Sequence, residues 1–230
     1  MKNHLEQLNR MALDFLFPPR CINCGREGEY ICNECLSQAS AIKPPVCPTC
    51  ILPITGNRKC DCCFWQSLDR LSSPYVFQGV IRKAVIQFKF HNLRAIAPFF
   101  ATLLSRYLTT RPIAYDLIVP VPLHDKRGRE RGYNQAFLLA KELSKINGAK
   151  FETALKRAFY ASSQVNSFSA SDRRKNVKGA FVCTDSAVTG KRILLIDDVA
   201  TTGSTLDSCA TSLKKAGAST VQALTLAREI

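Results

Sequence analysis

Two aspartates and a run of hydroxyl-bearing residues follow one strongly apolar segment, and together they could hold a phosphorylated sugar. The segment Ile193–Thr205 reads I-L-L-I-D-D-V-A-T-T-G-S-T. Its apolar beginning is typical of a strand that is buried on both faces, and a helix is predicted to follow from Ser204. Open α/β sheets bind ligands at the carboxyl ends of their strands, where a helix N-terminus offers unpaired backbone N–H groups to a phosphate.

The residue types divide the chemistry of this segment into two halves. The hydroxyl groups donate hydrogen bonds to a phosphate, and the glycine lets the backbone close around the anion. Asp197 and Asp198 suit sugar hydroxyls or Mg²⁺ instead, since two carboxylates cannot help to bind a phosphate. The alternative is an ordinary helix capped by Thr201 or Thr202, with two solvated aspartates before it. The predicted phosphate-binding residues are Thr201, Thr202, Gly203, Ser204 and Thr205.

Cysteine pairs provide a second chemistry near the other end of the chain. Of the 11 cysteines, eight form four C-x2-C pairs. Each pair can form a tight turn that points two thiolates at one metal, and two such turns complete a tetrahedral zinc site. Four pairs therefore predict two zinc sites, although the spacing leaves open which pairs share each ion. The alternative is a disulfide framework, which requires an oxidising compartment. The predicted ligands are Cys21, Cys24, Cys32, Cys35, Cys47, Cys50, Cys60 and Cys63.

The residue after each cysteine pair indicates how regular its turn can be. Gly25 follows Cys24 and suits a turn that requires a positive φ. Ile51 stands at the equivalent position after Cys50. We therefore expect the second zinc site to be less regular than the first.

Apolar periodicity predicts the elements that must position these groups. Strands that alternate with helices indicate a mostly parallel sheet with helices on both faces. A change of composition near Trp65 divides the chain into an N-terminal helix (1–20), a cysteine module (21–66) and an α/β domain (67–230). Helices are predicted over residues 2–16, 79–90, 97–109, 134–146 and from 204, and strands over 75–78, 116–121, 154–158, 178–183, 191–197 and 220–227.

Charge and hydropathy limit the classes of function. The formal net charge is +14, of which residues 67–230 carry +13 and residues 1–66 carry +1. A charge this high is expected to indicate an anionic partner, such as nucleic acid or a phosphorylated metabolite, or a membrane surface. The longest unbroken apolar run, Ala136–Ala140, is far shorter than the ~20 residues of a membrane span. Residues 1–17 lack the apolar core of a secretory signal. We therefore expect a cytoplasmic protein without a transmembrane segment.

The aspartate and threonine segment resembles the phosphoribosyl pyrophosphate (PRPP) motif of type I phosphoribosyltransferases. Residues 119–122 take the position of that family's pyrophosphate loop, and residues 159–177 the position of its lid. The resemblance narrows to the ComF/GntX family of competence-associated proteins, which pairs cysteine knuckles with a phosphoribosyltransferase-like domain. The motifs that carry it are V-P-V-P-L-H (119–124), R-G-Y-N-Q-A (131–136), Q-V-N-S-F-S (164–169), R-R-K-N-V-K-G-A-F (173–181) and D-D-V-A-T-T-G (197–203).

The resemblance implies both a fold and a set of site residues. The fold is α/β, with a mostly parallel sheet of the type I phosphoribosyltransferase type, a small N-terminal zinc-finger-like module and a hood over residues 67–115. Asp197 and Asp198 would hold ribose hydroxyls, directly or through Mg²⁺, while residues 201–205 would bind the 5′-phosphate. The pyrophosphate side would be lined by Arg131, Asn134 and Gln135, and the lid would contain Gln164, Arg173 and Arg174.

Three functions remain open at this point. The first is a competence factor that handles incoming single-stranded DNA during natural transformation, together with other proteins of the DNA-uptake machinery. The second is an active phosphoribosyltransferase, whose acceptor and catalytic residue the sequence does not identify. The third is a PRPP-sensing adaptor whose zinc module docks a partner. The ComF resemblance and the basic C-terminal domain favour the first function.

Overall fold

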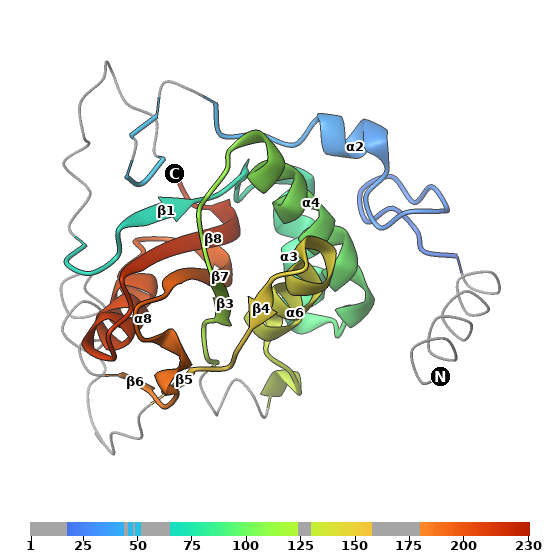
Figure 1. The fold of residues 1–230 in the computed structure, drawn as a ribbon. Helices are drawn as coiled ribbons and strands as arrows, with labels where there is room; N and C mark the ends of the chain where they lie inside the picture. Colours follow the sequence, from blue (N-terminus) through green and yellow to red (C-terminus); the bar gives the residue numbers. More distant parts are fainter. Residues whose placement is uncertain (1–17, 44–45, 48, 52–64, 124–129, 158–179) are drawn as a thin grey trace, which may run out of the picture.

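The computed structural model describes residues 18–43, 46–47, 49–51, 65–123, 130–157 and 180–230 (Figure 1). At their centre lies a six-stranded sheet in which every strand pair is parallel. A separate antiparallel pair is formed by β5 (Leu155–Arg157) and β6 (Phe181–Cys183). In spatial order the main sheet contains β1 (Arg70–Ser72), β8 (Thr220–Arg228), β7 (Arg192–Ala200), β3 (Leu117–Pro120) and β4 (Lys150–Phe151), with β2 (Tyr75–Val76) also paired to β8.

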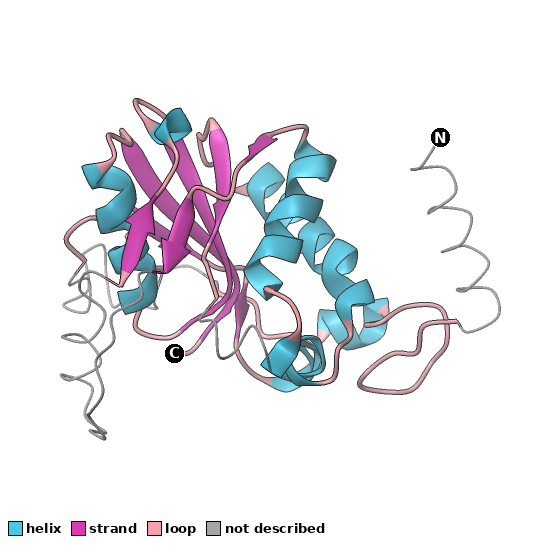
Figure 2. Ribbon diagram, turned by 90° about the horizontal axis from the view of Figure 1, so that it is seen from below, coloured by secondary structure: helices cyan, strands magenta, loops and turns pink. Residues whose placement is uncertain are grey.

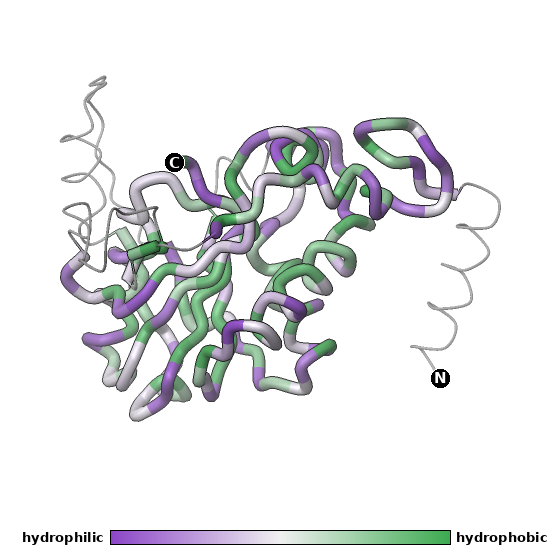
Figure 3. The backbone as a smooth tube through the Cα atoms, turned by 90° about the horizontal axis from the view of Figure 1, so that it is seen from above, coloured by the Kyte–Doolittle hydropathy of each residue, from purple (hydrophilic) through white to green (hydrophobic). Residues whose placement is uncertain are grey.

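Helices cover both faces of this sheet, as the sequence predicts (Figure 2). One face carries α3 (Gly79–Phe90), α4 (Ala97–Thr110) and α6 (Gln135–Asn147), and the other carries α8 (Ser204–Lys215). Side chains of β7 alternate between the two cores: Leu194 packs on the first layer and Leu195 on the second. A strand that is buried on both faces must be apolar throughout, and hydrophobic segments accordingly follow the central strands in Figure 3.

The strand β7 is longer than its apolar run predicts. We expected it to end at residue 197, but it extends from Arg192 to Ala200 and stays paired with β8 up to its last residue. Asp197 and Asp198 therefore lie within the strand instead of following it. Backbone pairing continues past the aspartates because β8 runs alongside as far as Arg228.

The remaining elements follow the predicted order with small differences. The short strands β1 and β4 carry no periodic signal and were not predicted, whereas both members of the β5–β6 pair were. The predicted helix over residues 2–16 lies outside the described residues. Within the described ranges, no helix is long and apolar enough to cross a membrane.

The N-terminal segment packs against the helical layer of the α/β domain. It contains the short helix α2 (Asn33–Ser37), which Figure 1 shows next to α4. Cys21, Ile31 and Cys35 belong to the same hydrophobic core as α3 and α4. The cysteine-rich segment is therefore in direct contact with the helices that cover the sheet.

Candidate functional site

The loop between β7 and α8 has the geometry of an anion-binding site. Gly203, with φ +79°, takes the left-handed conformation at the start of α8 and offers no capping side chain to the helix. The Thr202 hydroxyl lies 2.7 Å from the Ser204 hydroxyl and accepts the Ser204 backbone N–H at 3.3 Å. Thr201, Thr202 and Thr205 are exposed. These hydroxyls therefore surround the positive end of a 12-residue helix, where they are accessible to a phosphate.

The two aspartates before this loop have different surroundings. Asp198 is buried, with 5% of its surface exposed, and its Oδ1 forms an ion pair with Lys89 Nζ at 2.8 Å. Asp197 is half-buried, and its Oδ1 accepts the Asp198 backbone N–H at 2.8 Å. Lys89 lies in the last turn of α3. The ion pair thus joins a helix of the predicted hood to the strand that carries the aspartates.

Sequence reasoning missed Lys89 as a site residue. In the sequence, Lys89 is one of several lysines and arginines that lie outside the apolar face of α3, and nothing in the pattern singles it out. Only the contact with Asp198, which is far away in the sequence, distinguishes Lys89 from Lys83 or Arg82.

A cavity of about 410 Å³ lies beside this ion pair. The guanidinium carbon of Arg131 lies 4.7 Å from the Phe90 ring centroid, and that of Arg94 lies 4.5 Å from the Tyr133 ring centroid. Three cations and one carboxylate line the cavity, so its wall attracts anions. The lining residues are Lys89, Phe90, Asn92 and Arg94 on the α3 side, and Glu130, Arg131 and Gly132 before α6.

The three residues predicted for the pyrophosphate side lie in two environments. Arg131 reaches the cavity and donates from Nη1 to Gln135 Oε1 at 3.3 Å. Asn134 caps α6, and its Nδ2 donates to the Val121 carbonyl at 2.9 Å. Gln135 is only 2% exposed. Asn134 therefore anchors the predicted pyrophosphate loop, and a direct contact of Asn134 or Gln135 with pyrophosphate stays a prediction.

The single tryptophan of the chain packs against the loop between β7 and α8. Trp65 Nε1 donates to the Thr202 carbonyl at 3.1 Å, and a Cβ atom on Gly203 would lie 2.7 Å from this nitrogen. The Asp207 carboxylate, in the first turn of α8, accepts the backbone N–H groups of Ser67 and Leu68 at 2.9 Å each. The segment that joins the two predicted domains is thus fixed to the helix that would bind the phosphate.

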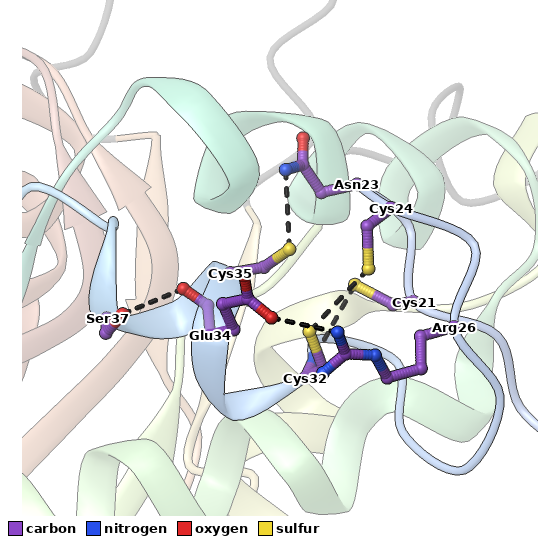
Figure 4. A network of polar contacts seen from close by, with 8 residues as sticks. All are labelled: Cys21, Asn23, Cys24, Arg26, Cys32, Glu34, Cys35 and Ser37. Atoms are coloured by element: carbon purple, nitrogen blue, oxygen red, sulfur yellow. Dashed lines mark hydrogen bonds and ion pairs between the residues drawn. The ribbon is translucent and has the colours of Figure 1, made fainter.

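Four cysteines come together in the N-terminal module (Figure 4). The backbone N–H of Cys32 donates to Cys21 Sγ, and the Asn23 side chain donates to Cys35 Sγ. Burial raises the pKa of Cys21, but backbone N–H groups of Cys32, Cys24 and Asn23 outweigh burial and lower this pKa to about 6. Four cysteine sulfur atoms gathered at one point are the ligand set that zinc takes, as thiolates, in structural sites. The sulfur atoms of Cys21, Cys24, Cys32 and Cys35 all lie within 4.8 Å of one another.

The third cysteine pair forms the same turn as the first. Ile51 N–H donates to the Cys47 carbonyl at 2.8 Å, as Gly25 N–H does to the Cys21 carbonyl. Ile51 has a φ of +53°, which is strained for a β-branched residue. Ile51 therefore makes the same backbone hydrogen bond as Gly25 but at a strained φ, and the regularity of the second zinc site as a whole stays a prediction. Several predicted site residues lie outside the described ranges and stay predictions: Cys60 and Cys63 of the second zinc site, and Gln164, Arg173 and Arg174 of the lid.

Comparisons with known proteins match a family to each part of the chain. Residues 12–64 match the double zinc ribbon domain, and residues 133–230 match the phosphoribosyl transferase domain. Competence protein F of Haemophilus influenzae is 32% identical over 228 residues, which cover 91% of this chain and 96% of that protein. The DNA utilization protein YhgH of Escherichia coli K12 is 32% identical over 211 residues, which cover 87% and 91%. A solved allosteric regulatory enzyme of purine biosynthesis is 20% identical, covers 56% of this chain and 25% of that chain, and gives a TM-score of 0.40.

The matches extend over both parts of the molecule. The zinc ribbon match covers the four clustered cysteines, and the phosphoribosyl transferase match covers β7, the β7–α8 loop and α8. The predicted fold is therefore confirmed, as is the likeness to competence proteins. The chain belongs to the ComF/GntX family of competence and DNA utilization proteins, in which a zinc ribbon precedes a phosphoribosyltransferase domain.

Proposed function

We propose that this protein handles incoming single-stranded DNA in the cytoplasm during natural transformation, and that it binds a phosphoribosyl group or 5′-phosphate at the β7–α8 loop. The observation that carries the proposal is the threonine-rich loop that leads from β7, the strand of Asp197 and Asp198, into α8, near a cationic cavity. The names of the relatives, competence protein F and DNA utilization protein, support the cellular role.

Each part of the site has a separate task in this proposal. The hydroxyls of Thr201–Thr205 and the N-terminus of α8 would hold the 5′-phosphate. Asp197 and Asp198 would hold ribose hydroxyls, directly or through Mg²⁺, which prefers oxygen ligands of this kind. Arg131 would bind the pyrophosphate group of PRPP, because this group is strongly anionic and needs a cation of its own, apart from the loop that holds the 5′-phosphate. Zinc in the ribbon would stabilise the fold and take no part in ligand binding.

Single-stranded DNA would bind at the same positively charged cavity, next to the β7–α8 loop. Residues 67–230 carry most of the positive charge, and three of these cations line the cavity beside Asp198. The 5′-phosphate of a strand and the 5′-phosphate of PRPP present the same group to the loop. We therefore propose that PRPP and a 5′-phosphorylated strand compete for the site.

A second candidate function is transfer of the phosphoribosyl group to an acceptor. The cavity of about 410 Å³ adjoins Asp198 and is large enough for a small acceptor molecule. Release of pyrophosphate from PRPP in the presence of candidate bases or amines would distinguish this enzyme from a protein that only binds.

Fluorescence anisotropy of a 5′-phosphorylated, 3′-labelled oligonucleotide tests the proposal. Counterion release predicts that affinity falls with NaCl, at a log–log slope near about −3 for roughly four phosphate contacts. Added PRPP should displace the strand. Arg131→Ala should weaken binding, whereas Arg111→Ala, which removes a charge from the end of α4, serves as the matched control. Absence of binding would contradict the DNA-handling role, and a flat salt response would contradict the proposed phosphate contacts. A steep response without displacement by PRPP would place the strand away from the loop.

A further inference from the structure

We infer that a second cavity, between the N-terminal segment and helix α4, binds a small acid in which a carboxylate is joined to an apolar body. This cavity has a volume of about 290 Å³ and, among the described residues, shares no lining residue with the cavity beside Asp198. Its walls come from residues 36–42, from Pro74 and Tyr75, and from the C-terminal half of α4. The inference names a ligand other than the phosphoribosyl group and does not depend on the proposed function.

Backbone hydrogen bonds fix one wall of this second cavity without a ligand. The N–H of Ile42 donates to the Pro74 carbonyl at 3.0 Å, and the N–H of Val76 donates to the Ser40 carbonyl at 2.8 Å. The N-terminal segment and the start of β2 therefore run side by side. A ligand would bind to a surface that is already formed, which lowers the entropy cost of binding.

The charged groups of the second cavity are cations. Arg106 and Arg111 line it, whereas none of the described residues that line it is an aspartate or glutamate. Within the part of the chain that the structure describes, neither arginine forms an ion pair with a carboxylate. Cations near the end of α4 offset the negative end of the helix dipole, and a guanidinium there can still donate two parallel hydrogen bonds to one carboxylate. The cavity therefore attracts an anion.

The Tyr75 side chain places a hydroxyl near Arg106. The arginine lowers the pKa of this hydroxyl, but burial outweighs the arginine and raises the pKa above its ordinary value of 10.0. The hydroxyl therefore stays protonated at neutral pH and can donate a hydrogen bond to an anion. Tyr75 is half-buried and Arg106 is exposed. We expect the guanidinium and the hydroxyl to bind the same carboxylate.

The apolar part of the lining favours an acid with an apolar body over an inorganic anion. Ile42 and Leu103 are buried, and Leu36 and Pro74 are half-buried. Inorganic phosphate or acetate would use the cations and leave this apolar surface in contact with water. A phenyl group would cover the surface, and burial of apolar area stabilises the complex. The volume of about 290 Å³ is just below the range of about 300–1,000 Å³ for drug-sized ligands, which suits an acid with a single ring.

Ligand titrations of the full chain, followed by the backbone amide signals in NMR spectra, test the inference. The probe is phenylpropionate. Phenylpropionamide has the same shape without the charge, whereas acetate and inorganic phosphate have a charge without the apolar body. Arg106→Gln removes the cation, and Tyr75→Phe removes the hydroxyl. Arg82→Gln is the matched control, because Arg82 is an exposed arginine of α3 that does not line the cavity.

We expect the wild type to bind phenylpropionate saturably, with a Kd of about 1 mM or below. It should bind the amide, acetate and phosphate about tenfold more weakly. The amide signals that move should belong to residues 36–42 and 103–111. Arg106→Gln should weaken binding about tenfold and Tyr75→Phe about threefold, whereas Arg82→Gln should bind like the wild type. Saturating PRPP should leave the affinity for phenylpropionate unchanged.

Three results would overturn the inference. The first is folded wild-type protein that does not bind phenylpropionate, or that binds the amide, acetate or phosphate equally well. The second is wild-type affinity in Arg106→Gln or Tyr75→Phe, or an equal loss in Arg82→Gln, which would indicate a general effect of charge. The third is displacement of phenylpropionate by PRPP, or signal changes centred on the cavity beside Asp198, which would place the acid at the phosphoribosyl site.

Discussion

At the scale of single residues, the ion pair of Asp198 with Lys89 sets the electrostatics of the site. Asp198 is nearly inaccessible to water, and a buried carboxylate without a partner is costly. Lys89 therefore neutralises one of the two aspartates before any ligand or metal arrives. In our proposal this leaves Asp197 as the more accessible carboxylate for a ribose hydroxyl.

Replacement of Lys89 should destabilise the fold, because the buried Asp198 carboxylate loses its ion-pair partner. Lys89→Met is expected to lower the free energy of unfolding by about 3 kcal/mol, because Asp198 stays buried without its partner. The double variant Lys89→Met/Asp198→Asn should recover much of this loss. Urea unfolding followed by circular dichroism measures both. A single variant as stable as the wild type would show that the pair contributes nothing.

At the scale of elements, the β7–α8 loop is packed against Trp65, a residue that is distant from it in the sequence. Trp65 Nε1 bonds to the carbonyl of Thr202, and the indole fills the space where a side chain at position 203 would lie. Asp207 fixes the following residues to α8. The loop conformation therefore depends on the segment that connects the zinc ribbon to the α/β domain.

A pair of glycine variants separates backbone strain from the contact with Trp65. Gly190→Ala and Gly203→Ala both place an alanine at positive φ, but only at position 203 would the added Cβ atom lie within 3 Å of the indole. We expect a loss of about 1 kcal/mol for Gly190→Ala and at least about 2 kcal/mol for Gly203→Ala. Gly203→Ala should also change the fluorescence emission of Trp65, the only tryptophan. Equal losses without a fluorescence change would contradict the packing described here.

The start of β3 is joined to the start of β7 by a pH-sensitive pair. Hydrogen bonds from the Arg192 guanidinium and backbone N–H lower the pKa of Asp116 to about 2. Because the folded-state pKa lies below its ordinary value of 3.8, the pair stabilises the fold above that value. This contribution is lost as the pH falls through about 2. Asp116→Asn should make the unfolding free energy less dependent on pH between about 4 and 2, and an unchanged pH profile would refute the contribution.

Apolar periodicity was sufficient to predict most helices and strands, and with them the place of the β7–α8 loop. It failed at β7, because the aspartates end the apolar run while β8 continues the backbone pairing. It also missed Lys89, Phe90 and Trp65. Their importance arises from contacts between residues that are far apart in the sequence, such as the hydrogen bond between Trp65 and Thr202, which are 137 positions apart. A local sequence pattern cannot predict contacts of this kind.

At the scale of the whole molecule, helix α3 connects the cysteine cluster to the aspartates. Near its start, Lys83 donates to Asn23 Oδ1 at 2.8 Å, and Asn23 in turn donates to Cys35 Sγ. At its end, Lys89 pairs with Asp198. Damage to the zinc ribbon should therefore affect the ligand site through the position of this helix.

Zinc content tests the two predicted metal sites. We expect purified protein to contain two zinc ions, and Cys35→Ser to lose one of them together with several kcal/mol of stability. Cys183→Ser is the control, because Cys183 lies in β6 away from the cluster. Elemental analysis under reducing conditions gives the count. One ion in the wild type would rule out the second site, and fully folded protein without metal would rule out the structural role of zinc.

The most direct test of the central claim is calorimetric titration with PRPP, with and without Mg²⁺. The account predicts saturable binding by the wild type that is strengthened by Mg²⁺. In Asp197→Asn/Asp198→Asn, which keeps the size of both side chains, affinity should fall by at least about tenfold while circular dichroism shows an intact fold. Equal binding by this variant and the wild type, or no binding by folded wild-type protein, would contradict the assignment of β7 and its loop as a phosphoribosyl site.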